Sequence, residues 1–358
     1  GCAAPTEGAS DLADHAPVRS THRQLASRVD AERSLMTRTD ADRIAAESSD
    51  ASDRMEIVTP REVPLGGPRA MTVRRTLPNR DRTTIGPWCF LDHYGPDPVT
   101  TTGGMLVAPH PHTGLQTVSW LFEGTIQHRD STGSDALVVP GELNLMTAGA
   151  GIQHSEVSTP GTTTLHGVQL WVALPDEHRQ QEPHFDVRES VVRDIDGVRV
   201  QLITGHLADV GTVDAPAYWP MVAAQIDFPA GHRLALSLVS DFEYGLLVDR
   251  GDITVEDCTV SKHHLGYLAP GSRSISMAAG DEPSRVLLIG GKPFEEELVM
   301  WWNFIGRDHE EIVALREEWQ AGLEMGSARF GHLPPMEPLP APEMPGVRLK
   351  SRPPSRRD

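Results

Sequence analysis

Short runs in which apolar and polar residues alternate follow one another along most of the chain after residue 54. In the stretch 115–122, Val118, Trp120 and Phe122 occupy every second position. Side chains two residues apart on a strand point to the same face of a sheet, so this spacing predicts strands. Turn signals containing Gly or Pro separate the runs about every ten residues, which predicts an antiparallel barrel or sandwich.

The strand-like runs form two groups, one in 55–185 and one in 186–305. Turns recur at similar places in both groups, and such an internal repeat predicts two related β domains. We expect the polar stretch 175–192 to link them. The corresponding turns are Gly124 and Pro140-Gly141 in the first group, and Gly251 and Pro270-Gly271 in the second.

Both ends of the chain depart from this β pattern. Residues 1–54 contain no Phe, Trp or Tyr, and their low hydrophobicity predicts a disordered extension. The region 306–325 is expected to hold one short helix, because its apolar residues recur at the spacing of one helical face. The Pro-rich and basic stretch 326–358 is expected to form an extended tail. The apolar residues of the predicted helix are Ile312, Leu315 and Trp319.

Charge and cysteine content narrow the classes of function. A net charge of −18 argues against direct binding to nucleic acid or to an anionic membrane. No run approaches the ~18 consecutive apolar residues that span a bilayer. Cys2, Cys89 and Cys258 lie far apart, a spacing that favours neither a disulfide framework nor a thiolate zinc site. The lack of a disulfide framework predicts a reducing compartment, the cytoplasm. We expect a monomer.

Two pairs of potential metal ligands each have one residue between their members. His110 and His112 form the first pair, and His154 and Glu156 form the second. On a strand, the two side chains of a pair point to one face, roughly 6.5 Å apart along the backbone. If the pairs lie on facing strands of one barrel, three imidazoles and one carboxylate meet in a small volume.

Such a set suits one mononuclear divalent ion of iron, manganese, nickel, copper or zinc. Four protein ligands leave an octahedral ion two open positions, enough for a bidentate substrate or for a substrate and dioxygen. Four single histidines are better explained as surface or core residues. His128 is the most interesting of these, since its predicted strand follows a hairpin beside the paired ligands. The four are His128, His166, His178 and His184, and the adjacent His263 and His264 would point to opposite faces of a strand.

Several longer motifs resemble the pirin family of the cupin superfamily. The resemblance covers residues 55–345 and implies two cupin barrels in tandem, of the double-stranded β-helix or jelly-roll type. In this family only the N-terminal barrel usually holds a metal ion, most often non-haem iron. The matching motifs are GPWCFLDH at 86–93, PHPHTG at 109–114, MTAGAGIQHSE at 146–156, GVQLWV at 167–172, GGKPF at 290–294 and WWNF at 301–304.

The resemblance implies that His110, His112, His154 and Glu156 are the metal ligands, with Fe(II) as the expected ion. Gln116 departs from the general cupin pattern, which places a Glu at that position, although the residue there is not a ligand in pirins. We therefore expect metal binding to be retained and the C-terminal barrel to hold no metal.

Two kinds of activity follow from the resemblance. Some pirin-like proteins are quercetin 2,3-dioxygenases, in which a metal-bound flavonol ring is opened by dioxygen. Glu156 would then be the catalytic base, and Phe90, Trp120 and Met146 could line an apolar pocket or simply belong to the core. Other members, in animals, act as iron-dependent coregulators of transcription factors. A third interpretation is a stress-linked metabolic regulator whose partner is another enzyme. The expected partner is therefore a small aromatic substrate such as a flavonol, or a protein.

Overall fold

The computed structural model describes residues 55–65 and 71–353. The chain divides into two compact units, Gly1–Asp53 and Arg54–Asp358. The first unit, and with it the predicted N-terminal extension, lies outside the described residues. All that follows concerns the second unit.

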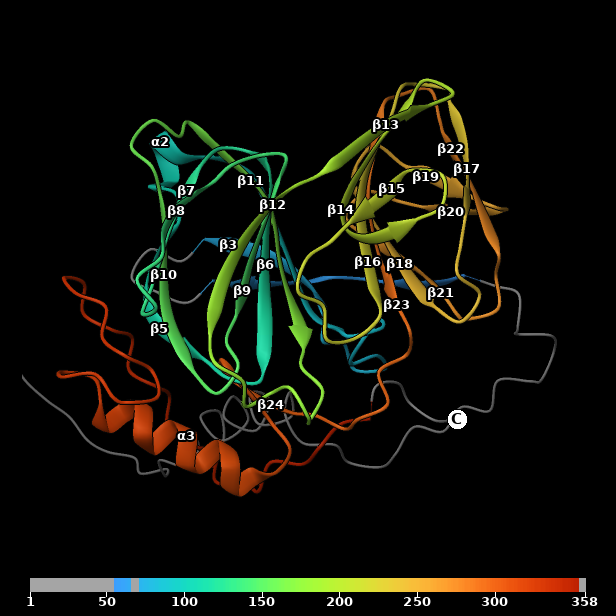
Figure 1. The fold of residues 1–358 in the computed structure, drawn as a ribbon. Coiled ribbons are helices and arrows are strands. Elements are labelled where there is room, and N and C mark those ends of the chain that lie inside the picture. The colour runs from blue at the N-terminus through green and yellow to red at the C-terminus, as the bar shows by residue number, and fades with distance from the viewer. Residues whose placement is uncertain (1–54, 66–70, 354–358) are drawn as a thin grey trace, which may run out of the picture. The chain divides into compact units, whose positions relative to one another are not determined.

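The second unit contains two β-barrels, each built from one large and one small antiparallel sheet (Figure 1). In the first barrel, the seven-stranded sheet has the order β12-β9-β6-β11-β4-β3-β2, and the four-stranded sheet has the order β5-β10-β7-β8. The large sheet comprises β2 (Arg61–Pro64), β3 (Thr72–Leu77), β4 (Trp88–Pro98), β6 (Leu115–Glu123), β9 (Glu142–Thr147), β11 (Thr164–Ala173) and β12 (His184–Glu189). The small sheet comprises β5 (Leu106–His112), β7 (Ile126–Asp130), β8 (Asp135–Val138) and β10 (Ile152–Ser158), and a short helix, α2 (Val99–Thr102), follows β4.

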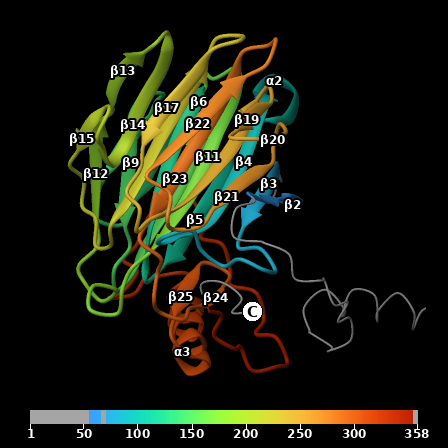
Figure 2. The same cartoon turned by 90° about the vertical axis from the view of Figure 1, so that its right-hand side faces the viewer.

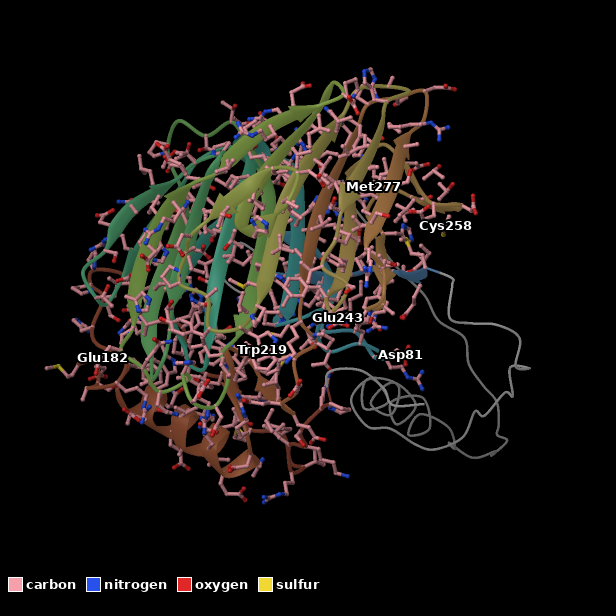
Figure 3. All side chains as sticks on the ribbon, turned by 45° about the vertical axis from the view of Figure 1, so that its right-hand side comes forward. Asp81, Glu182, Trp219, Glu243, Cys258 and Met277 are labelled. Atoms are coloured by element: carbon pink, nitrogen blue, oxygen red, sulfur yellow. The ribbon has the colours of Figure 1, made fainter. Side chains whose placement is uncertain are left out.

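The second barrel repeats this arrangement. Its core is apolar: Met277 is fully buried, whereas Cys258 lies at the outer edge of the small sheet (Figure 3). The eight-stranded sheet comprises β1 (Glu56–Val58), β13 (Val191–Ile195), β14 (Val198–Leu207), β15 (Gly211–Val213), β16 (Met221–Phe228), β18 (Glu243–Arg250), β21 (Leu265–Leu268) and β23 (Ser284–Gly291). The small sheet comprises β17 (Arg233–Ser237), β19 (Ile253–Val255), β20 (Cys258–Val260) and β22 (Ser274–Ala279).

The predicted all-β class, with two cupin barrels and one short C-terminal helix, is confirmed. Strand pairing differs from the expected partition at two places. The three-residue strand β1 pairs with β21 and so belongs to the second barrel. The stretch 175–192 is not a simple linker, because β12 within it pairs with β9 and completes the large sheet of the first barrel.

The two large sheets pack on each other through a shared apolar core. The alternation of β6 decides which of its side chains reach this core: Val118 and Trp120 face the second barrel, whereas Ser119 points into the first. Two buried indole N–H groups donate hydrogen bonds across the contact. Trp88 Nε1 donates to the Gly290 carbonyl at 3.0 Å, and Trp120 Nε1 donates to Gln225 Oε1 at 2.9 Å.

The C-terminal segment contains a hairpin of β24 (Val299–Trp301) and β25 (Phe304–Gly306), followed by α3 (His309–Ala321) (Figure 2). The predicted helix is therefore present. Asp308 caps it by accepting a hydrogen bond from the Glu311 N–H at 2.8 Å. Ile312, Leu315 and Trp319 are buried, as their spacing predicted.

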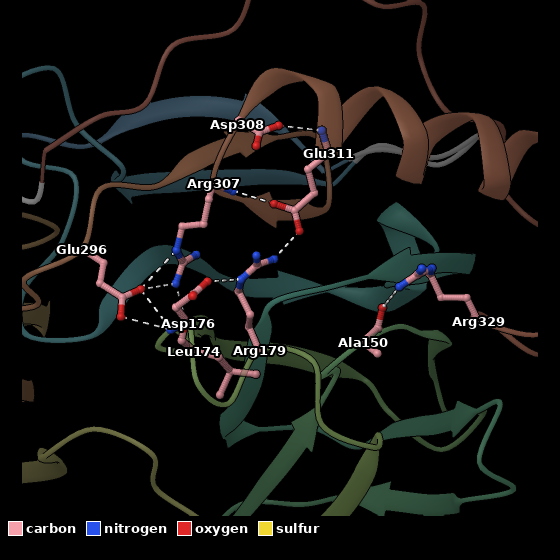
Figure 4. A network of polar contacts seen from close by, with 9 residues as sticks. All are labelled: Ala150, Leu174, Asp176, Arg179, Glu296, Arg307, Asp308, Glu311 and Arg329. Atoms are coloured by element: carbon pink, nitrogen blue, oxygen red, sulfur yellow. Dashed lines mark hydrogen bonds and ion pairs between the residues drawn. The ribbon is translucent and has the colours of Figure 1, made fainter.

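Polar contacts attach this segment to the first barrel (Figure 4). Arg307 pairs with Glu296 and donates to the Leu174 carbonyl at 2.9 Å, while Arg329 donates to the Ala150 carbonyl at 2.9 Å. Further along, the Leu339 N–H donates to the carbonyl of Pro109, which lies in β5. The tail thus runs along the first barrel. Among the described residues, no helix is both long and apolar enough to cross a membrane.

Candidate metal centre

The two predicted ligand pairs lie on neighbouring strands of the small sheet in the first barrel. β5 carries His110 and His112, and β10 carries His154 and Glu156. The strands are antiparallel, and their register places His154 directly opposite His110. We expected facing strands of the barrel; instead the pairs are adjacent in one sheet, and a bulge between His154 and Glu156 interrupts the register with β5.

The three imidazoles form a tight group. The Nε2 atoms of His112 and His154 are 3.1 Å apart, and the three ring centroids lie within 5.0 Å of one another. One ring nitrogen from each of the three residues lies within 4.8 Å of the others. All three are buried, with His110 the most exposed at 7%.

Hydrogen bonds fix the tautomers of two of these rings. Nδ1 of His110 donates to the Ala108 carbonyl at 2.9 Å, and Nδ1 of His112 donates to the Asn303 carbonyl at 3.1 Å. Because a carbonyl oxygen can only accept, each Nδ1 carries the proton and each Nε2 keeps its lone pair. Burial lowers the pKa of His110 to about 4 and the pKa values of His112 and His154 well below their ordinary value, so all three rings are neutral at pH 7.

Glu156 is also buried but groups differently. Its carboxylate lies within 4.8 Å of ligand atoms of His154 and His128, and it is not part of the cluster with His110 and His112. Ser119 Oγ donates a hydrogen bond to Glu156 Oε1 at 3.0 Å. Burial raises the pKa of Glu156, although His128 and the Ser119 hydrogen bond act in the opposite direction.

This donor set fits a divalent metal ion. His112 keeps its lone pair on Nε2, 3.1 Å from His154 Nε2, so these two nitrogens can share a proton or bind one cation between or beside them. Neutral imidazoles with their Nδ1–H groups bound to carbonyl oxygens are the usual state of metal-ligating histidine. A carboxylate beside them supplies an anionic oxygen, and the combination suits a borderline divalent ion.

Other residues singled out from the sequence are not members of this group of possible ligands. Gln116 and Trp120 are on the face of β6 that packs on the second barrel: Gln116 Nε2 donates to Thr147 Oγ1 and to the Pro216 carbonyl. Phe90 and Met146 lie in an apolar cluster with Trp171, whose ring meets His112 edge-on at 5.0 Å. The partly exposed His178 and His184 pair with the carboxylates of Glu177 and Asp186.

A second histidine cluster joins the two barrels. Asp249 on β18 accepts hydrogen bonds from His93 Nε2 at 2.7 Å and from His166 Nε2 at 2.6 Å, and it pairs with Arg285 at 3.4 Å. Arg74 Nε donates to His93 Nδ1 at 3.3 Å, so His93 has no free lone pair. This cluster is therefore an interdomain polar contact and not a metal site.

Two groups that contact the proposed ligands were not predictable from the sequence. Ser119 is an ordinary polar residue of an alternating strand, and the Asn303 carbonyl belongs to the backbone, so neither carries a sequence signal. Asp130 does carry one, because His128 and Asp130 show the same one-residue spacing as the ligand pairs.

Comparison with known proteins identifies the family. A family model described as Pirin matches residues 70–172, and one described as Pirin C-terminal cupin domain matches residues 218–326. A Pseudomonas aeruginosa protein, provisionally named quercetin 2,3-dioxygenase, is 41% identical over 84% of this chain and 95% of its own length. The chain belongs to the pirin family.

Further relatives agree with this assignment. A pirin-like protein of Caulobacter vibrioides is 34% identical over 70% of this chain and 88% of its own length. A crystal structure of a quercetin 2,3-dioxygenase from Acinetobacter baumannii superimposes with a TM-score of 0.76 and 34% identity, covering 83% of this chain and 97% of that one. Membership of the pirin family and the histidine cluster together indicate a site for a single metal ion.

Proposed function

We propose that this pirin-family protein binds one mononuclear divalent metal ion through His110, His112, His154 and Glu156. The observations that support the proposal are the cluster of three neutral, buried imidazoles on two paired strands and the buried carboxylate of Glu156, whose ligand oxygen lies within 4.8 Å of a ligand atom of His154. Fe(II) is the first choice, and it suits the reducing cytoplasm that the cysteine pattern predicts. Mn, Ni, Cu and Zn ions fit the same ligands.

We further propose that the metal form is a dioxygenase that opens the flavonol ring of quercetin with dioxygen. The names of the Pseudomonas and Acinetobacter relatives, together with the near-complete coverage of their chains, support this choice. A divalent ion in the site supplies Lewis acidity and, when redox-active, electron transfer between substrate and dioxygen.

The residues of the chain prepare the substrate for this chemistry. Glu156 removes the proton of the flavonol 3-hydroxyl, and its burial suits this task because a raised pKa brings the carboxylate closer to neutral pH as a base. Ser119 holds Oε1 of Glu156 and leaves Oε2 for the proton. The apolar surroundings of His112, which include Trp171, exclude water.

Metal content and oxygen uptake test both steps. Elemental analysis of the wild type is expected to give about one metal ion per chain, and His110→Ala combined with Glu156→Ala is expected to lose it. Metal retained in the double variant would disprove the ligand set. Anaerobic loading with Fe(II) should then give oxygen uptake that depends on quercetin and that the double variant lacks.

The alternative is an iron-dependent regulator that acts through protein contacts. One observation favours it: His112 donates to the Asn303 carbonyl, so a ligand of the proposed metal touches the C-terminal hairpin directly. A change in the ion can therefore reach a surface segment. Metal binding without oxygen uptake on quercetin, together with hydrogen exchange in 299–306 that changes on iron oxidation, would support this function over the enzyme.

A further inference from the structure

The side of His154 that faces away from His112 is occupied by a second imidazole. His154 Nδ1 lies 3.4 Å from His128 Nδ1, and His128 Nε2 lies 3.0 Å from Asp130 Oδ2. The three side chains form a line that ends at His154 Nε2, the atom that faces His112. All of them are buried, with exposed fractions of 2% or less.

The direction of each hydrogen bond in this line follows from Asp130, the residue at the end away from His112. Asp130 Oδ1 accepts from the backbone N–H and the hydroxyl of Thr132 at 2.9 and 2.6 Å. With Oδ1 of the carboxylate taken by these two donors, Oδ2 is left to His128 Nε2 at 3.0 Å. An ionised carboxylate only accepts, and His128 Nε2 must therefore be the donor.

This direction sets the tautomer of His154. With its Nε2 proton directed at Asp130, His128 can accept only through Nδ1. A hydrogen bond at that atom takes the Nδ1–H of His154, which leaves the lone pair of His154 on Nε2. Ala108 and Asn303 impose the same tautomer on His110 and His112. Each of the three rings thus has its own hydrogen-bond acceptor at Nδ1. For His154 that acceptor is the side chain of His128.

Strand register and stacking hold His128 in place. β7 pairs with β10 so that Asp130 lies opposite His154, and His128 lies opposite Glu156. The ring of His128 stacks on Phe185 of β12, with centroids 4.3 Å apart and planes inclined by 13°. The ring therefore has a fixed orientation before any metal binds.

We propose that His128 and Asp130 are positioning residues for the metal centre, which orient His154 and hold its lone pair on Nε2. This inference rests on the proposed ligand set. It assigns His128 no bond to the metal, because its Nδ1 approaches the Nδ1 edge of His154 and not the Nε2 edge. The rival assignment is His128 as a ligand together with His154 and Glu156, whose ligand atoms also lie within 4.8 Å of one another.

The test compares variants of His128 by metal affinity and by spectrum. His128→Phe keeps the stacking on Phe185 and removes the acceptor, whereas His128→Asn retains a carbonyl acceptor near the position of Nδ1. His166→Phe is the matched control, because it also removes a buried imidazole bonded to a buried carboxylate, Asp249, but outside the metal group. The probe is Co(II), whose affinity is measured against a competing chelator and whose visible absorption reports the ligand geometry.

We expect His128→Phe to bind Co(II) about 10- to 100-fold more weakly than the wild type, with altered absorption bands. His128→Asn should recover part of the affinity and the wild-type bands, and His166→Phe should bind as the wild type does. Asp130→Asn should weaken binding less than His128→Phe, since the ring stays in place.

The outcomes separate this inference from the proposed function. If the wild type binds no Co(II), or if His110→Ala binds it normally, the ligand set itself fails. If His110→Ala loses binding but His128→Phe matches the wild type in affinity and spectrum, only the positioning role is overturned. A third outcome is that His128→Phe loses binding as completely as His110→Ala, with no recovery in His128→Asn. That outcome would make His128 a ligand and would also overturn the positioning role.

Discussion

At the scale of single residues, the direction in which a side chain points decides its role more than its type does. Gln116 stands where the general cupin pattern has a Glu, yet it lies on the outer face of β6. Its amide N–H groups donate to Thr147 Oγ1 at 2.9 Å and to the Pro216 carbonyl at 3.0 Å. A carboxylate could accept from the Thr147 hydroxyl but would face the Pro216 carbonyl with no proton to donate.

We therefore predict that Gln116→Glu lowers stability and leaves metal binding unchanged. A buried charge next to an acceptor should cost about 1–3 kcal/mol in the free energy of unfolding. Denaturant unfolding measures this cost, and elemental analysis measures the metal. If Gln116→Glu instead bound metal more tightly, the residue would have to point into the first barrel.

At the scale of elements, a glycine lets the C-terminal hairpin approach β5, the strand that carries His110 and His112. Gly114 connects β5 to β6 with φ of +70°, and a Cβ built on it would lie 2.3 Å from the Ile305 carbonyl oxygen of β25. The Ile305 N–H donates to the Thr113 carbonyl at 3.1 Å, so the hairpin backbone lies directly against the connection between β5 and β6. The same hairpin supplies the Asn303 carbonyl to His112.

Gly114→Ala should therefore destabilise the protein and weaken metal binding together. Gly133→Ala is the control, because Gly133 also has a positive φ, +97°, but no atom lies near its added Cβ. In the control, the free energy of unfolding should fall by about 1–2 kcal/mol from backbone strain alone. In Gly114→Ala it should fall further, because a backbone carbonyl must move. Denaturant unfolding and Co(II) titration of both variants measure the difference, and equal losses would contradict it.

The sequence predicts local elements and same-face pairs well, because both depend on spacing. Alternation located the strands of both barrels, and the one-residue spacing singled out the two pairs of proposed ligands, which the structure places on neighbouring strands. Pairing between distant segments was not predictable: β1 has three residues, and its partner β21 lies about 200 residues away. The Asn303 carbonyl and the outward direction of Gln116 depend on how the sheets pack, and no local pattern encodes that packing.

At the scale of the whole molecule, the barrels are joined by an apolar core and by polar contacts that include a charged cluster at Asp249. Its carboxylate has no exposed surface, and it accepts from His93 and His166 of the first barrel and pairs with Arg285 of the second. Burial alone would raise the pKa of Asp249, but the hydrogen bonds from His166 and His93 outweigh it and hold the pKa far below its ordinary value. The ionised form is therefore the one that joins the barrels.

A pKa that is lower in the folded state than in the unfolded state means that this carboxylate stabilises the fold at neutral pH. The contribution is complete above the unfolded pKa of about 3.9 and is lost as the pH falls below it. Asp249→Asn keeps the shape of the side chain but removes its charge. It should lower the free energy of unfolding at pH 7 by about 3–5 kcal/mol, because the surrounding donors lose their charged partner. The difference from the wild type should shrink as the pH is lowered below about 4.

Asp227→Asn tests whether the effect is specific to the link between the barrels. Asp227 binds the same Arg285 at 2.7 Å, but its side chain is 22% exposed and lies within the second barrel. Loss of this ion pair should lower the free energy of unfolding by about 1 kcal/mol or less, since partly exposed ion pairs contribute little. Unfolding followed between pH 7 and pH 3 compares the three proteins. A gap between wild type and Asp249→Asn that stayed constant across this range would show that the charge of Asp249 does not couple the barrels.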